Sequence, residues 1–252
     1  MATPRIALAS TDSSAPRVVA PPDADSLRLL VDRALLASRP TDFDDALAYL
    51  DRQLQLRPGD PVLLHYQGFA LFRKASALTS AGQQPKVVKR MLEQADGVLE
   101  QSFRSLPWPE TLALRSAVAG QLIGSSGPFG AMRLGPRSSK LLDEAMAMNA
   151  DNPRVWMLRG ISSLYKPRLF GGSAEKAERD LTHALLLFER DHAAAPAPWW
   201  GHAETYGWLG QAYARQGRIA DARAAYLHAL QLEPDYAWVA RDLLPALERE
   251  SR

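Results

Sequence analysis

The chain has 252 residues, of which 46% are hydrophobic and 23% are charged, the balance of a soluble globular protein. Its formal charge of +2 is too small to indicate a nucleic-acid partner. The absence of cysteine excludes disulfides, thiol catalysis and cysteine-ligated zinc, and no apolar run is long enough to span a bilayer.

Residues 1–24 are rich in Ala, Ser, Pro and Asp, and this composition predicts a disordered leader or linker. The apolar piece "IALA" is too short for the core of a signal peptide. The same segment is compatible with the start of a mature secreted chain whose signal has been removed. A periplasmic or secreted location and a cytoplasmic location therefore both remain open.

Residues 25–252 predict one all-α domain built from helix pairs. Small and apolar residues recur at matching positions in successive pairs, and prolines lie at the pair boundaries. A final helix would cap the stack and shield its last apolar face. The expected pairs cover 27–60, 61–107, 109–152, 153–190 and 203–236, and the expected capping helix covers 236–249.

Capping signals mark three of the expected helix starts. Asp60-Pro61 and Asn152-Pro153 each place a capping side chain before a proline, which suits the first turn of a helix. Thr41 or Asp42 would cap the second helix of the first pair.

The clearest unit is "AETYGWLGQAYARQGRIADARAAYLHALQLEPDY", Ala203–Tyr236. Gly210 and Ala222 lack bulk, so the two antiparallel helices of this unit can approach closely. Gly217 ends the first helix and Pro234 ends the second. Weaker copies upstream carry Gly68 and Gly160 in the place of Gly210, and Ala46 and Ala177 in the place of Ala222.

The unit closely resembles a tetratricopeptide repeat. The matching residues are Tyr206, Leu209, Gly210, Tyr213, Ala222, Tyr226, Ala229 and Pro234. The resemblance implies a right-handed superhelical array of about five antiparallel helix pairs with a concave and a convex face. It also implies a noncatalytic scaffold that binds a protein or peptide in the concave groove, without a cofactor.

Three of the expected pairs exceed the roughly 34 residues of a regular unit, and the surplus predicts insertions. We place them at 78–88, at 124–136 and at 166–172. The second and third are rich in glycine and occupy equivalent places in consecutive pairs, so they should be neighbours. Together with "NPR" at 152–154, their sequences look like an uncharacterised bacterial subgroup of the family that carries a P-x-x-FGG loop.

A basic cluster accompanies these two insertions and suggests an alternative function. Arginine and the N–H groups of a glycine turn both suit an anion, so a pocket here would bind a small molecule or an anion, with an enzymatic role left open. In the competing interpretation, the glycines only form a turn before a helix capped by Ser173, and the cations are a solvated rim. The candidate residues are Arg133, Arg137, Lys140, Arg154, Arg159, Lys166, Arg168, Gly171 and Gly172.

The concave groove should be lined by the first helix of each pair. In the competing interpretation, Phe69, Phe72 and Tyr165 pack between helices as core. The carboxylate-binding Lys/Asn set of some relatives is missing, which argues against a receptor for chaperone tails. The candidate groove residues are His65, Phe69, Phe72, Arg73, Met157, Ile161, Tyr165, Glu204, Gln211 and Arg215.

The stretch "DHAAAPAPWWGHAE" contains two histidines and two carboxylates, but their spacing matches no metal motif, so we expect a surface histidine pair and no metal. Trp199 and Trp200 should pack under this loop or face the end of the groove. No phosphate loop, dinucleotide fingerprint or nucleophile elbow is present, so no catalytic residue is assigned.

Overall fold

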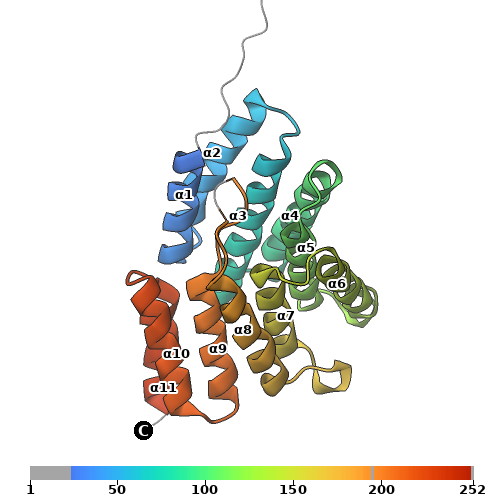
Figure 1. Cartoon of the computed structure of the whole chain (residues 1–252). Coiled ribbons are helices and arrows are strands. Elements are labelled where there is room, and N and C mark those ends of the chain that lie inside the picture. The colour runs from blue at the N-terminus through green and yellow to red at the C-terminus, as the bar shows by residue number, and fades with distance from the viewer. Residues whose placement is uncertain (1–23, 194–195, 251–252) are drawn as a thin grey trace, which may run out of the picture.

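A computed structural model of the chain describes residues 24–193 and 196–250, and this part contains helices and no strand (Figure 1). Most of the expected leader, 1–23, lies outside the described residues. Successive helices pack as antiparallel pairs, from α1 with α2 to α9 with α10, which confirms the expected all-α array of pairs. None of the described helices is both long enough and apolar enough to cross a membrane. The elements are α1 (Ala24–Ala37), α2 (Asp42–Leu56), α3 (Pro61–Ser80), α4 (Pro85–Ser105), α5 (Pro109–Ile123), α6 (Pro128–Met148), α7 (Pro153–Tyr165), η1 (Arg168–Phe170), α8 (Ala174–Phe188), α9 (His202–Arg215), α10 (Ile219–Leu232), η2 (Trp238–Leu243) and α11 (Leu244–Glu250).

The helix starts follow the capping signals in the sequence. Asp60 accepts hydrogen bonds from two first-turn N–H groups of α3, at 3.0 and 3.2 Å, and Asn152 does the same for α7. Ser173 accepts from the third N–H of α8 at 3.1 Å. At α2, Thr41 makes no such bond, while the carboxylate of Asp42 accepts from the backbone N–H of Arg39 at 2.9 Å.

Glycine sets the distance between the helices of three pairs. A Cβ atom at Gly210 would lie closer than 3.0 Å to the ring of Tyr226, which is itself buried. Gly68 and Gly160 are equally close to a leucine of the partner helix. The predicted close approach at Gly210 is therefore confirmed, and the same device recurs at the two upstream positions.

Two of the three predicted insertions are helical. The surplus near 78–88 lengthens α3 and α4 around a short turn, 81–84. The prediction of a loop at 124–136 is wrong, because α6 begins at Pro128 and continues through Pro136. Proline suits the first turn at Pro128, and the residues between the two prolines include good helix formers. With the extension α6 spans 21 residues, compared with 13 for α7.

The C-terminal helix departs from regular geometry at its start. The expected helix over 236–249 appears as η2, a π-helical segment, followed by α11. Pro245 has no N–H to donate to the carbonyl of Arg241, so the turn before it is wound more loosely.

Substituting Gly210 tests whether close helix packing outweighs the low helix propensity of glycine at this position. We expect Gly210→Ala to lower the free energy of unfolding by about 1–3 kcal/mol, because the added Cβ collides with a buried ring. Gly97→Ala in α4 is the matched control, since a Cβ there meets nothing within 4 Å. This control should raise stability by about 0.5–1 kcal/mol. Urea denaturation measures both values, and equal effects at the two glycines would contradict the packing argument.

Candidate functional site

The concave side of the array is partly filled by the chain's own segment 196–201, which we call the plug. In Figure 1 this segment, drawn in orange between α8 and α9, rises beside α3. The hydroxyl of Tyr66 donates to the carbonyls of Pro196 and Ala197, at 3.1 and 3.2 Å. Trp199 stacks on Tyr66 with ring centroids 4.8 Å apart, and its Nε1 donates to Asp32 of α1 at 2.7 Å.

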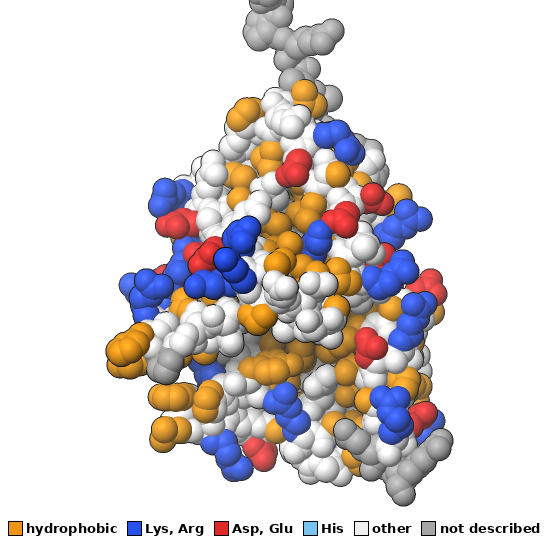
Figure 2. Space-filling model, turned by 180° about the vertical axis from the view of Figure 1, so that it is seen from behind, with side chains coloured by type: hydrophobic (Ala, Val, Ile, Leu, Met, Phe, Trp, Pro, Cys, Tyr) orange, Lys and Arg blue, Asp and Glu red, His pale blue; other side chains and the backbone are white. Residues whose placement is uncertain are grey.

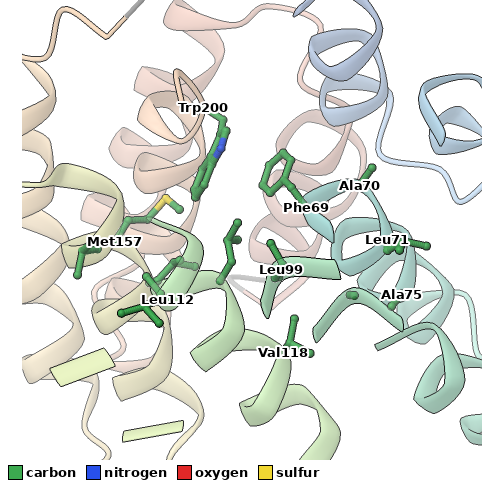
Figure 3. Packing of buried hydrophobic residues seen from close by; sticks show 14 of the residues in the cluster. Phe69, Ala70, Leu71, Ala75, Leu99, Leu112, Val118, Met157 and Trp200 are labelled. Carbon is green, nitrogen blue, oxygen red and sulfur yellow. The ribbon is translucent and has the colours of Figure 1, made fainter. Parts of the chain in front are cut away.

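Trp200 completes this contact inside the core. Its ring stacks on Phe69 at 4.7 Å with an interplanar angle of 17°, and only 3% of Trp200 is exposed (Figure 3). Gly201 follows with φ at +110°, and a Cβ there would crowd Phe188 and Met157. The plug is thus an integral part of the hydrophobic core.

Three predicted groove residues are consequently unavailable to a ligand. His65, Phe69 and Met157 are each at most 1% exposed, which corrects their assignment to an open groove. The plug covers Phe69 and Met157, a contact with no signature in the repeat pattern, whereas His65 packs against Thr111 and Trp108. His65 Nδ1 lies 2.8 Å from the hydroxyl of Thr111, and burial, aided by Arg154, lowers the pKa of His65 to about 3.

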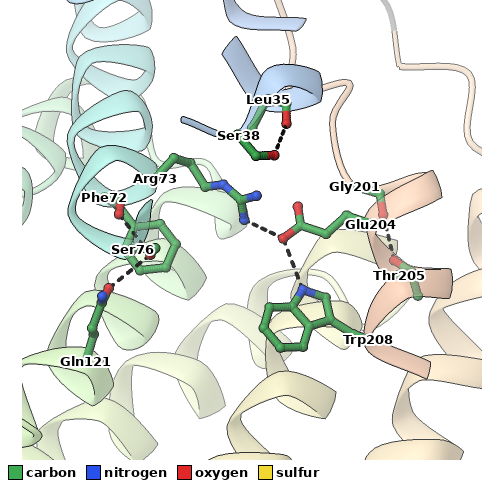
Figure 4. A network of polar contacts seen from close by, with 10 residues as sticks. All are labelled: Leu35, Ser38, Phe72, Arg73, Ser76, Gln121, Gly201, Glu204, Thr205 and Trp208. Atoms are coloured by element: carbon green, nitrogen blue, oxygen red, sulfur yellow. Dashed lines mark hydrogen bonds and ion pairs between the residues drawn. The ribbon is translucent and has the colours of Figure 1, made fainter. Parts of the chain in front are cut away.

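A polar network crosses the concave side next to the plug (Figure 4). Arg73 of α3 forms an ion pair with Glu204 of α9, and both side chains are largely buried. The indole N–H of Trp208 donates to the same carboxylate at 3.0 Å. Arg73 also hydrogen-bonds Tyr236, and burial raises the pKa of that tyrosine. These two predicted groove residues, Arg73 and Glu204, therefore join the early part of the array to its last repeat.

Other residues on the predicted inward side remain partly or fully exposed, and we call this set the open groove. Tyr165, at the end of α7, is 60% exposed and meets Trp208 edge to face at 5.9 Å. The guanidinium of Arg215 lies 5.0 Å from the Tyr165 ring, and its Nη1 donates to the carbonyl of Leu164. Phe72, Ile161 and Gln211 are half-buried. The open groove consists of Phe72, Ile161, Tyr165, Trp208, Gln211 and Arg215.

The predicted basic cluster does not converge. Arg154 is 2% exposed and pairs inside the protein with Asp191 at 2.7 Å. Arg137 points to Asp96 of α4 at 2.6 Å, a carboxylate that Arg115 also contacts. Both arginines are thereby removed from the expected anion site, because each lies beside a carboxylate of its own.

The glycine turn does not offer free N–H groups. The N–H of Gly171 donates to the carbonyl of Arg168 at 3.0 Å, and that of Gly172 donates to Pro167 at 3.2 Å. Gly171 has φ at +83°, and a Cβ at Gly172 would overlap the carbonyl of Lys166. The glycines are needed by the turn itself, so the predicted anion contacts of Gly171 and Gly172 are corrected.

Two of the predicted cations do lie together. Arg159 and Lys166 line a hollow of about 200 Å³ between α6, α7 and α8, where Lys176 joins them. Lys166 donates to the hydroxyl of Ser139 at 3.1 Å, and Arg159 lies 3.5 Å from Asp180. Burial and the charge of Lys176 lower the pKa of Lys166. Arg133, Lys140 and Arg168 are exposed, and Lys140 pairs with Glu144.

Of the two histidines near the plug, His202 serves packing, and His192 is exposed. His202 is half-buried and stacks on Phe188 at 5.2 Å, which differs from the expected surface pair. Among the described residues, no group of three His, Cys, Asp or Glu side chains could hold a metal ion.

The sequence indicated that Trp199 and Trp200 would pack against the protein, but it did not identify the residues that receive them. Trp199 and Trp200 follow a Pro-Ala run, which signals an extended segment. Nothing in the repeat pattern indicated that Asp32 and Tyr66, more than 100 residues away, would receive this segment.

Comparisons with known proteins agree with this architecture. A family model described as a tetratricopeptide repeat matches residues 203–236. The structure is similar to the HusA haemophore from Porphyromonas gingivalis, with 25% identity, a TM-score of 0.64, and coverage of 76% of this chain and 93% of that one. It is also similar to TTC0263, a thermophilic TPR protein of Thermus thermophilus, with 22% identity, a TM-score of 0.58, and coverage of 90% of this chain and 96% of that one. No curated protein matches the sequence.

Removing the plug's anchor should destabilise the whole domain. Trp200→Ala deletes a buried ring that stacks on Phe69, so we expect a loss of about 3–5 kcal/mol in the free energy of unfolding. Phe129→Ala, which truncates an aromatic ring that is 88% exposed, should change stability by no more than about 0.5 kcal/mol. Chemical denaturation compares the two. A small loss for Trp200→Ala would indicate that the plug contributes little to the core.

The buried histidine should make stability depend on pH. The pKa of His65 is about 3 in the folded protein and 6.5 ordinarily, so the unfolded chain binds the proton more readily. The stabilisation from neutral His65 is fully present above pH 6.5 and is lost as the pH falls toward 3. Between about pH 7 and pH 5, the wild type should lose about 2 kcal/mol more than His65→Gln, because carboxylate effects are common to both. Equal losses in the two proteins would contradict the burial argument.

Proposed function

Since the chain is a tetratricopeptide-repeat protein, we propose that it is a noncatalytic scaffold that binds a protein or peptide segment in the open groove. The single observation that carries this proposal is the exposure of Tyr165 beside Trp208 and Arg215. Aromatic and arginine side chains dominate the energetics of protein interfaces. These three come from the first helices of two consecutive pairs, the surface that such arrays offer to their ligands.

The chemistry of the open groove favours a short segment with mixed character. Phe72, Ile161 and Tyr165 offer apolar and aromatic surface to a hydrophobic side chain. Arg215 offers guanidinium donors, and Gln211 offers an amide. We infer that the preferred segment pairs an apolar or aromatic side chain with a carboxylate. The plug restricts this segment to a few residues, because the other half of the concave side is occupied.

A random peptide library displayed on phage and selected on the immobilised full chain tests this proposal. Enriched peptides should share an aromatic or aliphatic residue near an acidic one. Tyr165→Ala should weaken their binding by about thirtyfold, the loss typical of an interface hot spot. Leu29→Ala, which truncates a 72% exposed side chain on α1, should leave binding unchanged. Failure to enrich any peptide, or equal binding by the Tyr165 variant, would contradict the proposal.

A second candidate is the binding of a flat apolar molecule that carries acid groups, of which haem is an example. It is favoured by the similarity to a haemophore, together with the Tyr165 ring that stands exposed beside a guanidinium. Haemin titrated into the full chain should then shift its absorbance band, and Tyr165→Ala should reduce that shift. An unchanged haemin spectrum would exclude this candidate and leave the peptide proposal intact.

A further inference from the structure

Four large apolar side chains are strongly exposed on two neighbouring elements, and we call them the apolar edge: Phe129, Met132, Leu169 and Phe170. Their exposed fractions are 88%, 74%, 88% and 72%. Phe129 and Met132 lie on the first turns of α6, and Leu169 and Phe170 lie in η1 between α7 and α8. Soluble proteins rarely concentrate exposed side chains of this size in one place without a binding role.

Both elements lie at the edge where the two helices of a pair are joined, because α6 begins there and η1 connects α7 to α8. Lys166, just before η1, donates to Ser139 of α6. Met132 precedes Ser139 by seven residues, or about two helical turns, so both lie on the same side of α6. Figure 2 shows hydrophobic side chains projecting at the left of the view, where the half-turn from Figure 1 brings α6 and the turn between α7 and α8.

A cationic hollow begins two residues before η1, at Lys166, and about two turns along α6 from Met132, at Ser139. It is lined by Arg159, Lys166 and Lys176, together with Ser139 and two further serines. Asp143 also borders it, and Asp180 pairs with Arg159, so three cations face two carboxylates. Among the described residues, neither Lys166 nor Lys176 forms an ion pair with a carboxylate, and the nearest acidic neighbour of Lys166 in the hollow is Asp143. Their charge is therefore available to an external anion.

The arrangement points to an anionic phospholipid surface as the partner. We propose that the apolar edge enters the boundary between headgroups and acyl chains while the cationic hollow receives a lipid phosphate. A protein partner would need a matching pocket for each of four exposed side chains that come from two different elements. A bilayer needs none, because its fluid interior accommodates protruding side chains, and its phosphates complement the lysines.

Vesicle flotation with the full chain tests this inference. The protein should float with vesicles of phosphatidylcholine mixed with phosphatidylglycerol. A much smaller fraction of the protein should float with vesicles of phosphatidylcholine alone. The double substitution Leu169→Ser with Phe170→Ser should weaken binding by at least about tenfold. Lys166→Gln with Lys176→Gln should weaken it by about twentyfold and reduce its sensitivity to salt.

The matched controls remove the same kinds of side chain elsewhere. Leu29→Ser with Leu56→Ser deletes two exposed leucines of α1 and α2, and Arg33→Gln with Arg52→Gln deletes two exposed cations of the same helices. Neither pair should change vesicle binding. The far-ultraviolet circular dichroism and the thermal midpoint of each variant verify that it is folded.

Three results would overturn the inference. The first is an absence of vesicle binding, or equal binding to both vesicle types. The second is binding of inorganic phosphate, followed by calorimetry, that depends on the two lysines while vesicles are ignored. The third is concentration-dependent self-association, abolished by Leu169→Ser with Phe170→Ser, in a protein that does not float with vesicles. Peptide binding by the open groove is measured without lipid, so its success or failure is independent of these outcomes.

Discussion

The stacking of Trp199 and Trp200 on Tyr66 and Phe69 is the contact on which the rest of the structure depends. In a simple solenoid each repeat touches only its neighbours, and stability is a sum over adjacent units. Here the plug before α9 reaches α1 and α3, at separations of 130 residues and more. The Arg73–Glu204 ion pair makes a second connection of the same kind. Because early and late repeats share one core, the domain should unfold as a unit rather than fray from an end.

The contacts that join the early and late repeats also bring polar atoms into the interior. Arg154 is 2% exposed, and its guanidinium lies 5.3 Å from the ring of Phe188 and 6.0 Å from that of Trp200, in addition to its pair with Asp191. Its Nε, like Nε2 of His65 and Nε1 of Trp200, has no hydrogen-bond partner among the described residues. A buried polar atom left unpaired costs about 1–3 kcal/mol. The side chain of Trp200 is therefore held by ring stacking and shape, whereas hydrogen bonds hold the plug at Pro196, Ala197 and Trp199.

The local features of the fold could be predicted from the sequence because they depend on neighbours in the chain. The caps at Asp60 and Asn152 and the close approach at Gly210 each follow from spacing within one repeat. The long-range contacts could not be predicted in this way. Periodicity assigns Phe69 and Met157 to the inward side, but it does not say whether that side meets solvent or another segment.

The wrong prediction at α6 has a different origin, because residues 124–136 contain several glycines and two prolines, which normally indicate a loop. Pro136 costs one intrahelical bond within a helix of 21 residues, and packing of α6 along α5 outweighs that cost.

The end of α7 connects the two surfaces to which we assign binding roles. Tyr165 turns toward Trp208 in the open groove, while the next residue, Lys166, turns toward Ser139 in the cationic hollow. The carbonyl of Leu164 is held by Arg215, which fixes the backbone just before this divergence. A phosphate drawn to Lys166 would act on a backbone segment that also positions Tyr165. A protein held at a membrane by its apolar edge would accordingly present the mouth of the open groove close to that surface, where its ligand would have to approach along the bilayer.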